Sequence, residues 1–118
     1  MRDQPIPEVT RADVERVVRR DFPADSFSEI LSTLDQYDAT PGPPSARVQL
    51  AILKLADGNP TTLRKCIEDA KMDYRDVLAW AEYPDYMRKV PGPGQRLQSE
   101  VDQIIDADWK QYQAWLTR

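Results

Sequence analysis

Apolar residues along this 118-residue chain recur every three or four positions, in segments separated by proline and glycine. Because an α-helix has about 3.6 residues per turn, this spacing places apolar side chains on one face of a helix. Proline breaks helix interiors and glycine favours helix ends, so each segment is expected to be a separate helix. No segment alternates apolar and polar residues as a half-buried strand does. The sequence therefore predicts an all-α fold, a compact bundle of about six helices.

The first two predicted helices are amphipathic. The first has Thr10 as its N-cap and Asp13 three residues later, a spacing typical of a capping box. The second follows Pro23, with Asp25 or Ser26 as its cap. The apolar positions of the first helix are Val14, Val17 and Val18, and those of the second are Phe27, Ile30, Leu31, Leu34 and Tyr37.

The next predicted helix, in segment 46–58, is apolar nearly all round. A helix of this pattern is normally central and covered on two faces. Gly58 is placed to end it, and Asn59 and Pro60 fit the N-cap and first position of a fourth helix. The inner face of the fourth helix is expected to hold Leu63, Cys66, Ile67 and Ala70.

Two further helices are predicted in the last third of the chain. Asp73 is placed to cap a short fifth helix that Pro84 ends, and a loop containing VPGPG follows. The last helix is expected from Gln95 to about Thr117. Its apolar stripe contains Leu97, Val101, Ile104, Ile105, Tyr112, Trp115 and Leu116. By length, residues 1–118 form a single helical domain, with 1–8 as a flexible or extended N-terminal segment.

Asp108 projects into the middle of that last apolar stripe. A buried carboxylate must be paired or hydrogen-bonded, because an unpaired buried charge costs several kcal/mol. The expected partner is an arginine, such as Arg47 or Arg75, or a tyrosine hydroxyl. Asp108 is therefore a possible buried polar site and also the best candidate for a catalytic carboxylate, a role that needs a second titratable group nearby.

The fifth helix carries two apolar or aromatic faces. The core face holds Tyr74, Val77, Leu78 and Ala81. Trp80 and Tyr83 fall on the opposite face, and Tyr86 follows just beyond Pro84. We expect the last helix to cover this second face and Tyr86 to remain the most exposed of the three. The alternative is a protein-recognition patch, because aromatic residues and arginine dominate interface hot spots. That patch would contain Arg75, Trp80, Tyr83, Tyr86 and Arg88.

Composition excludes several kinds of chemistry. Twenty acidic and sixteen basic residues give a formal net charge of −4, which opposes indiscriminate binding to nucleic acid or anionic lipid. The chain has no histidine, so imidazole-activated nucleophiles and zinc sites of the Cys/His type are excluded. The stretch from Asp57 to Glu68 superficially resembles a calcium loop, but Thr62 stands where glycine is required. No metal, no cofactor and no phosphate-binding loop are therefore expected.

The sequence is expected to belong to a cytosolic protein. Its first nine residues contain no apolar signal region, and no apolar run approaches the roughly 20 residues needed to span a bilayer. The single cysteine, Cys66, cannot form an internal disulfide. It lies on the inner face of its helix and is interpreted as an inert core residue.

Two segments, RVQLAILKLADGN at 47–59 and DYRDVLAWAEYP at 73–84, resemble a group of small bacterial helical proteins to which no activity is assigned. The likeness covers the middle third of the chain. It implies a bacterial, cytosolic helical domain and no functional residue.

Three functional hypotheses remain open at this point. The first is a non-enzymatic interaction module that uses an aromatic or acidic surface to bind another protein or a second copy of itself. The second is a carboxylate-based enzyme with Asp108 in a cleft. The third is weak nucleic-acid binding, which requires the arginines of the first helix to align with basic residues of the fourth. The residues concerned are Arg16, Arg19, Arg20, Arg64, Lys65 and Lys71.

Overall fold

The computed structural model describes residues 5–37, 44–90 and 97–118. Its elements are α1 (Arg11–Asp21), the 3-10 turn η1 (Ala24–Ser26), α2 (Phe27–Leu34), α3 (Ser45–Ala56), α4 (Pro60–Glu82), α5 (Pro84–Lys89) and α6 (Gln98–Thr117). The described residues contain no strand, so the prediction of a compact all-α bundle is confirmed. Residues 91–94 of the predicted VPGPG loop, and the expected start of the last helix at Gln95, lie outside the described residues.

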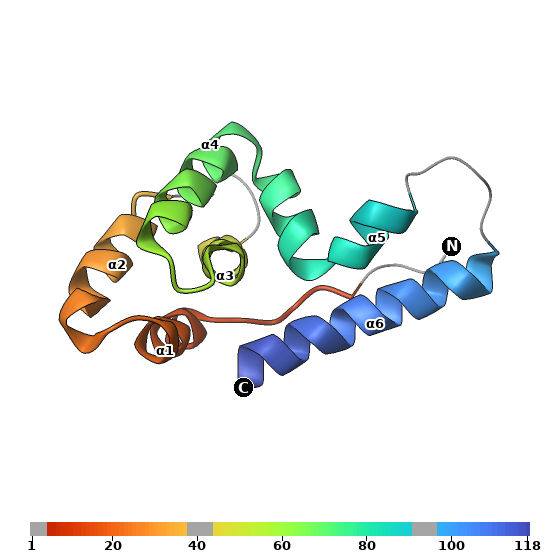
Figure 1. Cartoon of the computed structure of the whole chain (residues 1–118), viewed down its shortest axis with the longest axis horizontal. Helices are drawn as coiled ribbons and strands as arrows, with labels where there is room; N and C mark the ends of the chain where they lie inside the picture. The colour runs from red at the N-terminus through yellow and green to blue at the C-terminus, as the bar shows by residue number, and fades with distance from the viewer. Residues whose placement is uncertain (1–4, 38–43, 91–96) are drawn as a thin grey trace.

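Helix α3 is the centre of the bundle, seen nearly end-on between α1 and α4 in Figure 1. It packs chiefly on α4 and α1, as expected for a helix that is apolar on two faces. Its buried residues are Val48, Gln49, Leu50, Ala51, Ile52, Leu53 and Ala56. The prediction of a central apolar helix is confirmed.

A two-residue left-handed turn joins α3 to α4. Asp57 and Gly58 have φ values of 50° and 79°. A Cβ atom on Gly58 would lie 3.1 Å from the backbone oxygen of Asp21, so glycine suits both the backbone conformation and the close packing. The Asn59 side chain then accepts hydrogen bonds from the N–H groups of the two threonines after Pro60, at 2.9 and 3.1 Å. The predicted end of one helix and start of the next are confirmed.

Helix α4 bends at Asp73, whose backbone is not helical (φ −158°, ψ 101°). Beyond the bend, the side chain of Asp73 accepts a hydrogen bond from the backbone N–H of Arg75 at 3.0 Å. Asp73 thus caps a new helical segment, as its sequence position predicted. The predicted fourth and fifth helices are the two halves of α4, residues 60–72 and 74–82, and we call the bend between them the α4 elbow.

Helix α5 was not predicted. The sequence indicated a loop after Pro84, but residues 84–89 form a short helix with Pro84 in its first turn. Proline ends the preceding helix and is also well suited to the first position of the next one, where no N–H donor is required. The prediction that Pro84 ends the preceding helix is confirmed, and what it missed is that Pro84 also begins another.

Helix α6 runs below α5 and the second half of α4 in Figure 1. It packs on both. The residues that it buries are Val101, Ile105, Asp108, Tyr112, Trp115 and Leu116. Two residues of the predicted stripe are not buried: Ile104 is only partly buried, and Leu97 is 68% exposed at the start of the helix. At the other end, the Arg20 guanidinium lies over the Trp115 ring, 5.3 Å from its centroid, and donates a 2.7 Å hydrogen bond to the Trp115 carbonyl. Arg20 therefore ties the end of α6 to α1.

A buried ion pair joins α3 to the end of α4. The Arg47 guanidinium donates two hydrogen bonds to the Glu82 carboxylate, at 2.9 and 2.8 Å. The hydrogen bond to Glu82 raises the pKa of Arg47 above its usual value, so the guanidinium stays charged. From α6, Gln111 donates to the Glu82 backbone oxygen at 3.3 Å. Three helices therefore meet at this pair.

We expect Arg47→Met to lower the free energy of unfolding by roughly 3 kcal/mol, because it leaves the Glu82 carboxylate buried without its partner. Chemical denaturation followed by circular dichroism measures this. Arg64→Met is the matched control, since the Arg64–Glu29 pair is exposed and should contribute less than about 1 kcal/mol. Equal losses of unfolding free energy in the two variants would show that the buried pair stabilises the fold no more than an exposed one.

Candidate functional site

The five residues of the predicted recognition patch lie in different environments. Tyr83 is 4% exposed and packs against Val101 and Ile105 of α6. Its hydroxyl donates to the Pro5 carbonyl of the N-terminal segment. The last helix therefore covers Tyr83, as expected. It does not cover Trp80, which is 44% exposed.

Tyr86 was expected to be the most exposed aromatic residue of this region, and that expectation was wrong. Its side chain is only partly exposed and packs against the same cluster as Tyr83. The short helix α5 causes the difference, because it folds Tyr86 back toward α6. Trp80 is the aromatic residue of this group that stays exposed.

The two arginines of the predicted patch are engaged within the chain. Arg75 pairs with Asp73 through hydrogen bonds of 2.9 and 3.0 Å, and Arg88 pairs with Asp85 on α5. Neither arginine is joined with Trp80 in one pocket. The structure therefore does not bring the five residues together as a single surface.

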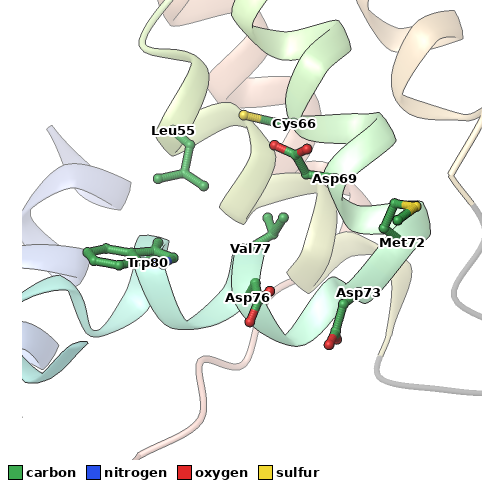
Figure 2. Close-up of a pocket in the computed structure, with 8 residues that line it drawn as sticks. All are labelled: Leu55, Cys66, Asp69, Met72, Asp73, Asp76, Val77 and Trp80. Carbon is green, nitrogen blue, oxygen red and sulfur yellow. The ribbon is translucent and has the colours of Figure 1, made fainter. Parts of the chain in front are cut away.

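Trp80 instead lines an open pocket inside the α4 elbow, with a cavity volume of about 580 Å³. The pocket receives side chains from α3 and from both halves of α4 (Figure 2). Trp80 and Met72 lie at opposite ends of it, with Val77 and Asp76 between them (Figure 2). The lining residues are Leu55, Cys66, Asp69, Met72, Asp73, Asp76, Val77 and Trp80. We call this the elbow pocket.

The elbow pocket exposes large apolar side chains to solvent. Met72 is 88% exposed and Trp80 is 44% exposed. Among the described residues, the other large apolar side chains with high exposure are Ile6 and Leu97, and neither lines the pocket. Exposed large apolar residues gathered around a concavity are typical of a binding surface, whereas single scattered ones need no explanation.

Three carboxylates, those of Asp69, Asp73 and Asp76, line the pocket together with these apolar side chains. Asp73 is paired with Arg75, whose hydrogen bonds hold the pKa of Asp73 below its usual value. Asp69 and Asp76 are exposed, and within the described part of the chain neither is in an ion pair. The pocket therefore carries a negative rim in which two carboxylates, Asp69 and Asp76, stand outside any ion pair of the described residues, although Arg75 is near enough to feel the charge of Asp76.

Cys66 forms part of the pocket wall. It is a free, buried cysteine. Burial raises the pKa of its thiol, and the nearby charge of Asp69 acts in the same direction. The thiol is therefore a neutral, apolar part of the wall, in agreement with its interpretation as a core residue.

The elbow pocket does not have the arrangement of a metal site. In the described ranges 5–37, 44–90 and 97–118, no three Asp, Glu or Cys side chains converge closely enough to hold a metal ion. The three carboxylates are spread around the pocket, in contrast to the convergent oxygen ligands of a calcium or magnesium site.

Asp108 is 1% exposed, as predicted from its position in the apolar stripe. Its partners differ from all those expected. The two carboxylate oxygens accept hydrogen bonds from the backbone N–H groups of Asp85 and Tyr86, at 3.1 and 2.9 Å. Asp108 therefore fixes the first turn of α5 from the neighbouring helix α6, because free N–H groups at a helix start favour a negative acceptor. An arginine or tyrosine partner was expected only because α5 itself was missed.

The charged groups around Asp108 stabilise the fold and do not form a catalytic site. Burial raises its pKa above the ordinary value of 3.8, while the N–H groups of Tyr86 and Asp85 act in the opposite direction. Lys54 of α3 is near enough to be influenced by its charge, and burial lowers the pKa of that lysine. Asp108 does not line the elbow pocket, so these two groups do not form an open catalytic cleft there.

The basic residues required for nucleic-acid binding are mostly paired with carboxylates. The pairs are Arg16–Asp13, Arg20–Asp21, Arg64–Glu29 and Lys71–Glu68. Internal pairing reduces the free positive charge available for phosphates. The structure thus gives no support to a basic stripe along α1 and α4.

No protein-family model, no curated protein and no solved structure matches this chain. Among the helices of the described residues, none has an apolar stretch long enough to cross a bilayer.

The sequence contains a signal for the elbow pocket that the predictions above did not use. Asp69, Asp73 and Asp76 gather around Asp73, where the sequence already predicts the junction of two helices. Met72 and Trp80 lie in the same stretch. What periodicity could not show is that Leu55 of α3 would complete the pocket with them.

We expect Asp108→Asn to lower the free energy of unfolding by about 1–3 kcal/mol, because the amide cannot accept both hydrogen bonds from α5. The folded protein binds the Asp108 proton more tightly than the unfolded chain, so this carboxyl favours folding most below pH 3.8. Its contribution falls as the pH rises through the raised pKa. The stability advantage of the wild type over Asp108→Asn should therefore grow from about pH 7 to about pH 4. Denaturant titrations at several pH values test this, and an advantage that shrinks on acidification would contradict it.

Proposed function

We propose that the protein is a non-enzymatic helical interaction module that binds another protein through the elbow pocket. The observation that carries this proposal is the joint exposure of Trp80 and Met72 in one concave, mainly apolar site. Large exposed apolar side chains lower the solubility of a free protein, and they gain most when a partner covers them. Tryptophan is moreover among the residues that contribute most to protein interfaces.

The side chains that line the pocket are better suited to binding a protein than to catalysing a reaction. Its floor is formed by the side chains of Leu55, Val77 and the protonated thiol of Cys66, none of which is a nucleophile or a general base in this setting. Its carboxylates lie at the exposed rim and are not paired with each other. A catalytic carboxylate normally needs burial or a close second group that adjusts its pKa.

The carboxylate-enzyme hypothesis is less well supported. Asp108 has both oxygens hydrogen-bonded to backbone N–H groups, and it is almost completely buried. A substrate would have to displace the first turn of α5 to reach it. We assign the module to the cytosol as part of this proposal, since Cys66 is a free thiol in a buried position.

The double variant Trp80→Ser/Met72→Ser tests the proposed function. Because Met72 is 88% exposed and Trp80 is 44% exposed, we expect the free energy of unfolding to fall by no more than about 3 kcal/mol. Affinity for a bound protein should fall roughly 30-fold or more, the effect of removing an interface hot spot. Wild-type and variant proteins would be used as baits in the source cells, and the recovered proteins quantified by mass spectrometry.

The matched control is Ile6→Ser/Leu97→Ser, which removes two exposed apolar side chains of 63% and 68% exposure that do not line the pocket. Proteins recovered by the wild type should also be recovered by this control and be lost with Trp80→Ser/Met72→Ser. The same recovery with all three baits would reject the elbow pocket as the binding surface.

A further inference from the structure

We propose that the occupant of the elbow pocket is a basic amphipathic helix of a partner protein. Its apolar residues would enter between Trp80 and Met72, and its lysine or arginine residues would pair with Asp69 and Asp76. This inference rests on the proposed function and adds the chemistry of the partner.

The negative charge of the pocket rim favours a partner with positively charged side chains. Asp69 and Asp76 are exposed carboxylates without an ion pair in the described part of the chain, and Asp73 adds a third negative group that Arg75 neutralises. An acidic segment would face like charges there, while lysine or arginine would gain opposite charges next to an apolar surface. The net charge of −4 extends this preference beyond the pocket, because it attracts basic partners over a longer range.

The spacing of the pocket groups favours an extended partner over a small cation. No three carboxylate or thiol groups among the described residues converge on one point, so a metal ion or a compact ammonium ion would meet only one or two of them. The apolar side chains lie at both ends of the pocket, with the carboxylate of Asp76 between them (Figure 2). A ligand that satisfies all of these groups must present several apolar and cationic groups in sequence.

A helix meets this requirement better than an extended strand. The pocket is built from α3 and the two halves of α4, and the described residues contain no strand. There is thus no sheet edge to which an extended peptide could add, and recognition must depend on side chains. An amphipathic helix presents residues at i, i+3, i+4 and i+7 on one face, which is how helices bind in apolar grooves.

A second copy of this chain does not fit the same pocket face to face. In a two-fold symmetric dimer, each residue of the patch meets the corresponding patch of the partner. Asp69, Asp73 and Asp76 of one copy would then face the same three carboxylates of the other. Repulsion between them opposes this arrangement.

Selection of peptides from a random library displayed on phage tests the inference whatever the natural partner is. The immobilised full-length protein is the target, and each selected peptide is then measured by isothermal titration calorimetry against wild type and Trp80→Ser/Met72→Ser. We expect the selected peptides to combine apolar residues at helical spacing with an excess of lysine and arginine. Their binding should be lost in the double variant and should weaken several-fold from about 0.05 M to about 0.5 M salt.

A second pair of variants isolates the role of the two rim carboxylates. Asp69→Asn/Asp76→Asn should weaken the selected peptides roughly threefold or more, a reasonable effect for two exposed charge pairs. The matched control is Glu8→Gln/Asp25→Asn, which changes the net charge equally but alters exposed residues outside the pocket. The control should bind as the wild type does.

The outcomes separate this inference from the proposed function. Selected peptides that require Trp80 and Met72 but show no excess of basic residues would overturn the basic partner and leave the interaction module intact. Basic peptides that bind Asp69→Asn/Asp76→Asn as well as they bind the control would also overturn it. Peptides whose binding does not depend on Trp80 and Met72, or a library from which no peptide is selected, would reject both.

Discussion

The buried ion pair between Arg47 and Glu82 is the constraint on which the candidate site depends. The second half of α4 changes direction at the elbow, and this pair attaches its last turn to α3. A charge pair in such a position costs desolvation, and it stabilises only because both hydrogen bonds of the guanidinium are well formed. What it supplies is a fixed angle between the two halves of α4. The elbow pocket is the space enclosed by that angle, with Leu55 of α3 completing it.

Helix α6 contacts the second half of α4 on its other side, through apolar packing and hydrogen bonds to the backbone. Tyr83 packs against α6, and Gln111 and Asp108 provide hydrogen bonds to the backbone at the end of α4 and the start of α5. These contacts involve one face of the second half of α4, while Trp80 lines the elbow pocket together with Leu55 of α3. The exposure of Trp80 is therefore a consequence of where the supporting helix lies, and does not reflect a general looseness of this region.

Much of the fold could be predicted because it depends on local rules. Capping by Thr10, Asn59 and Asp73, and the central position of α3, follow from side-chain chemistry and helical periodicity. The errors have a common origin in tertiary structure. A helical wheel places Trp80 and Tyr83 on one face, but it cannot show that α6 covers only Tyr83. Likewise, Asp108 was correctly predicted to be buried. Its partners, the backbone N–H groups at the start of α5, could not be predicted because Pro84 was interpreted only as a helix end.

The division of the apolar interior into two clusters has a consequence for the motions of the molecule. The large cluster includes α1, α3, most of α4 and the end of α6, whereas the small one consists of Tyr83, Val101 and Ile105 with Tyr86 and Val90 at its margin. The two are joined through polar contacts at Asp108 and Gln111. Because a small cluster stabilises its surroundings less than a large one, we expect α5 and the first turns of α6 to open more readily than the rest of the described structure. Amide hydrogens in this part would exchange with solvent through local opening, and those of α3 only through global unfolding.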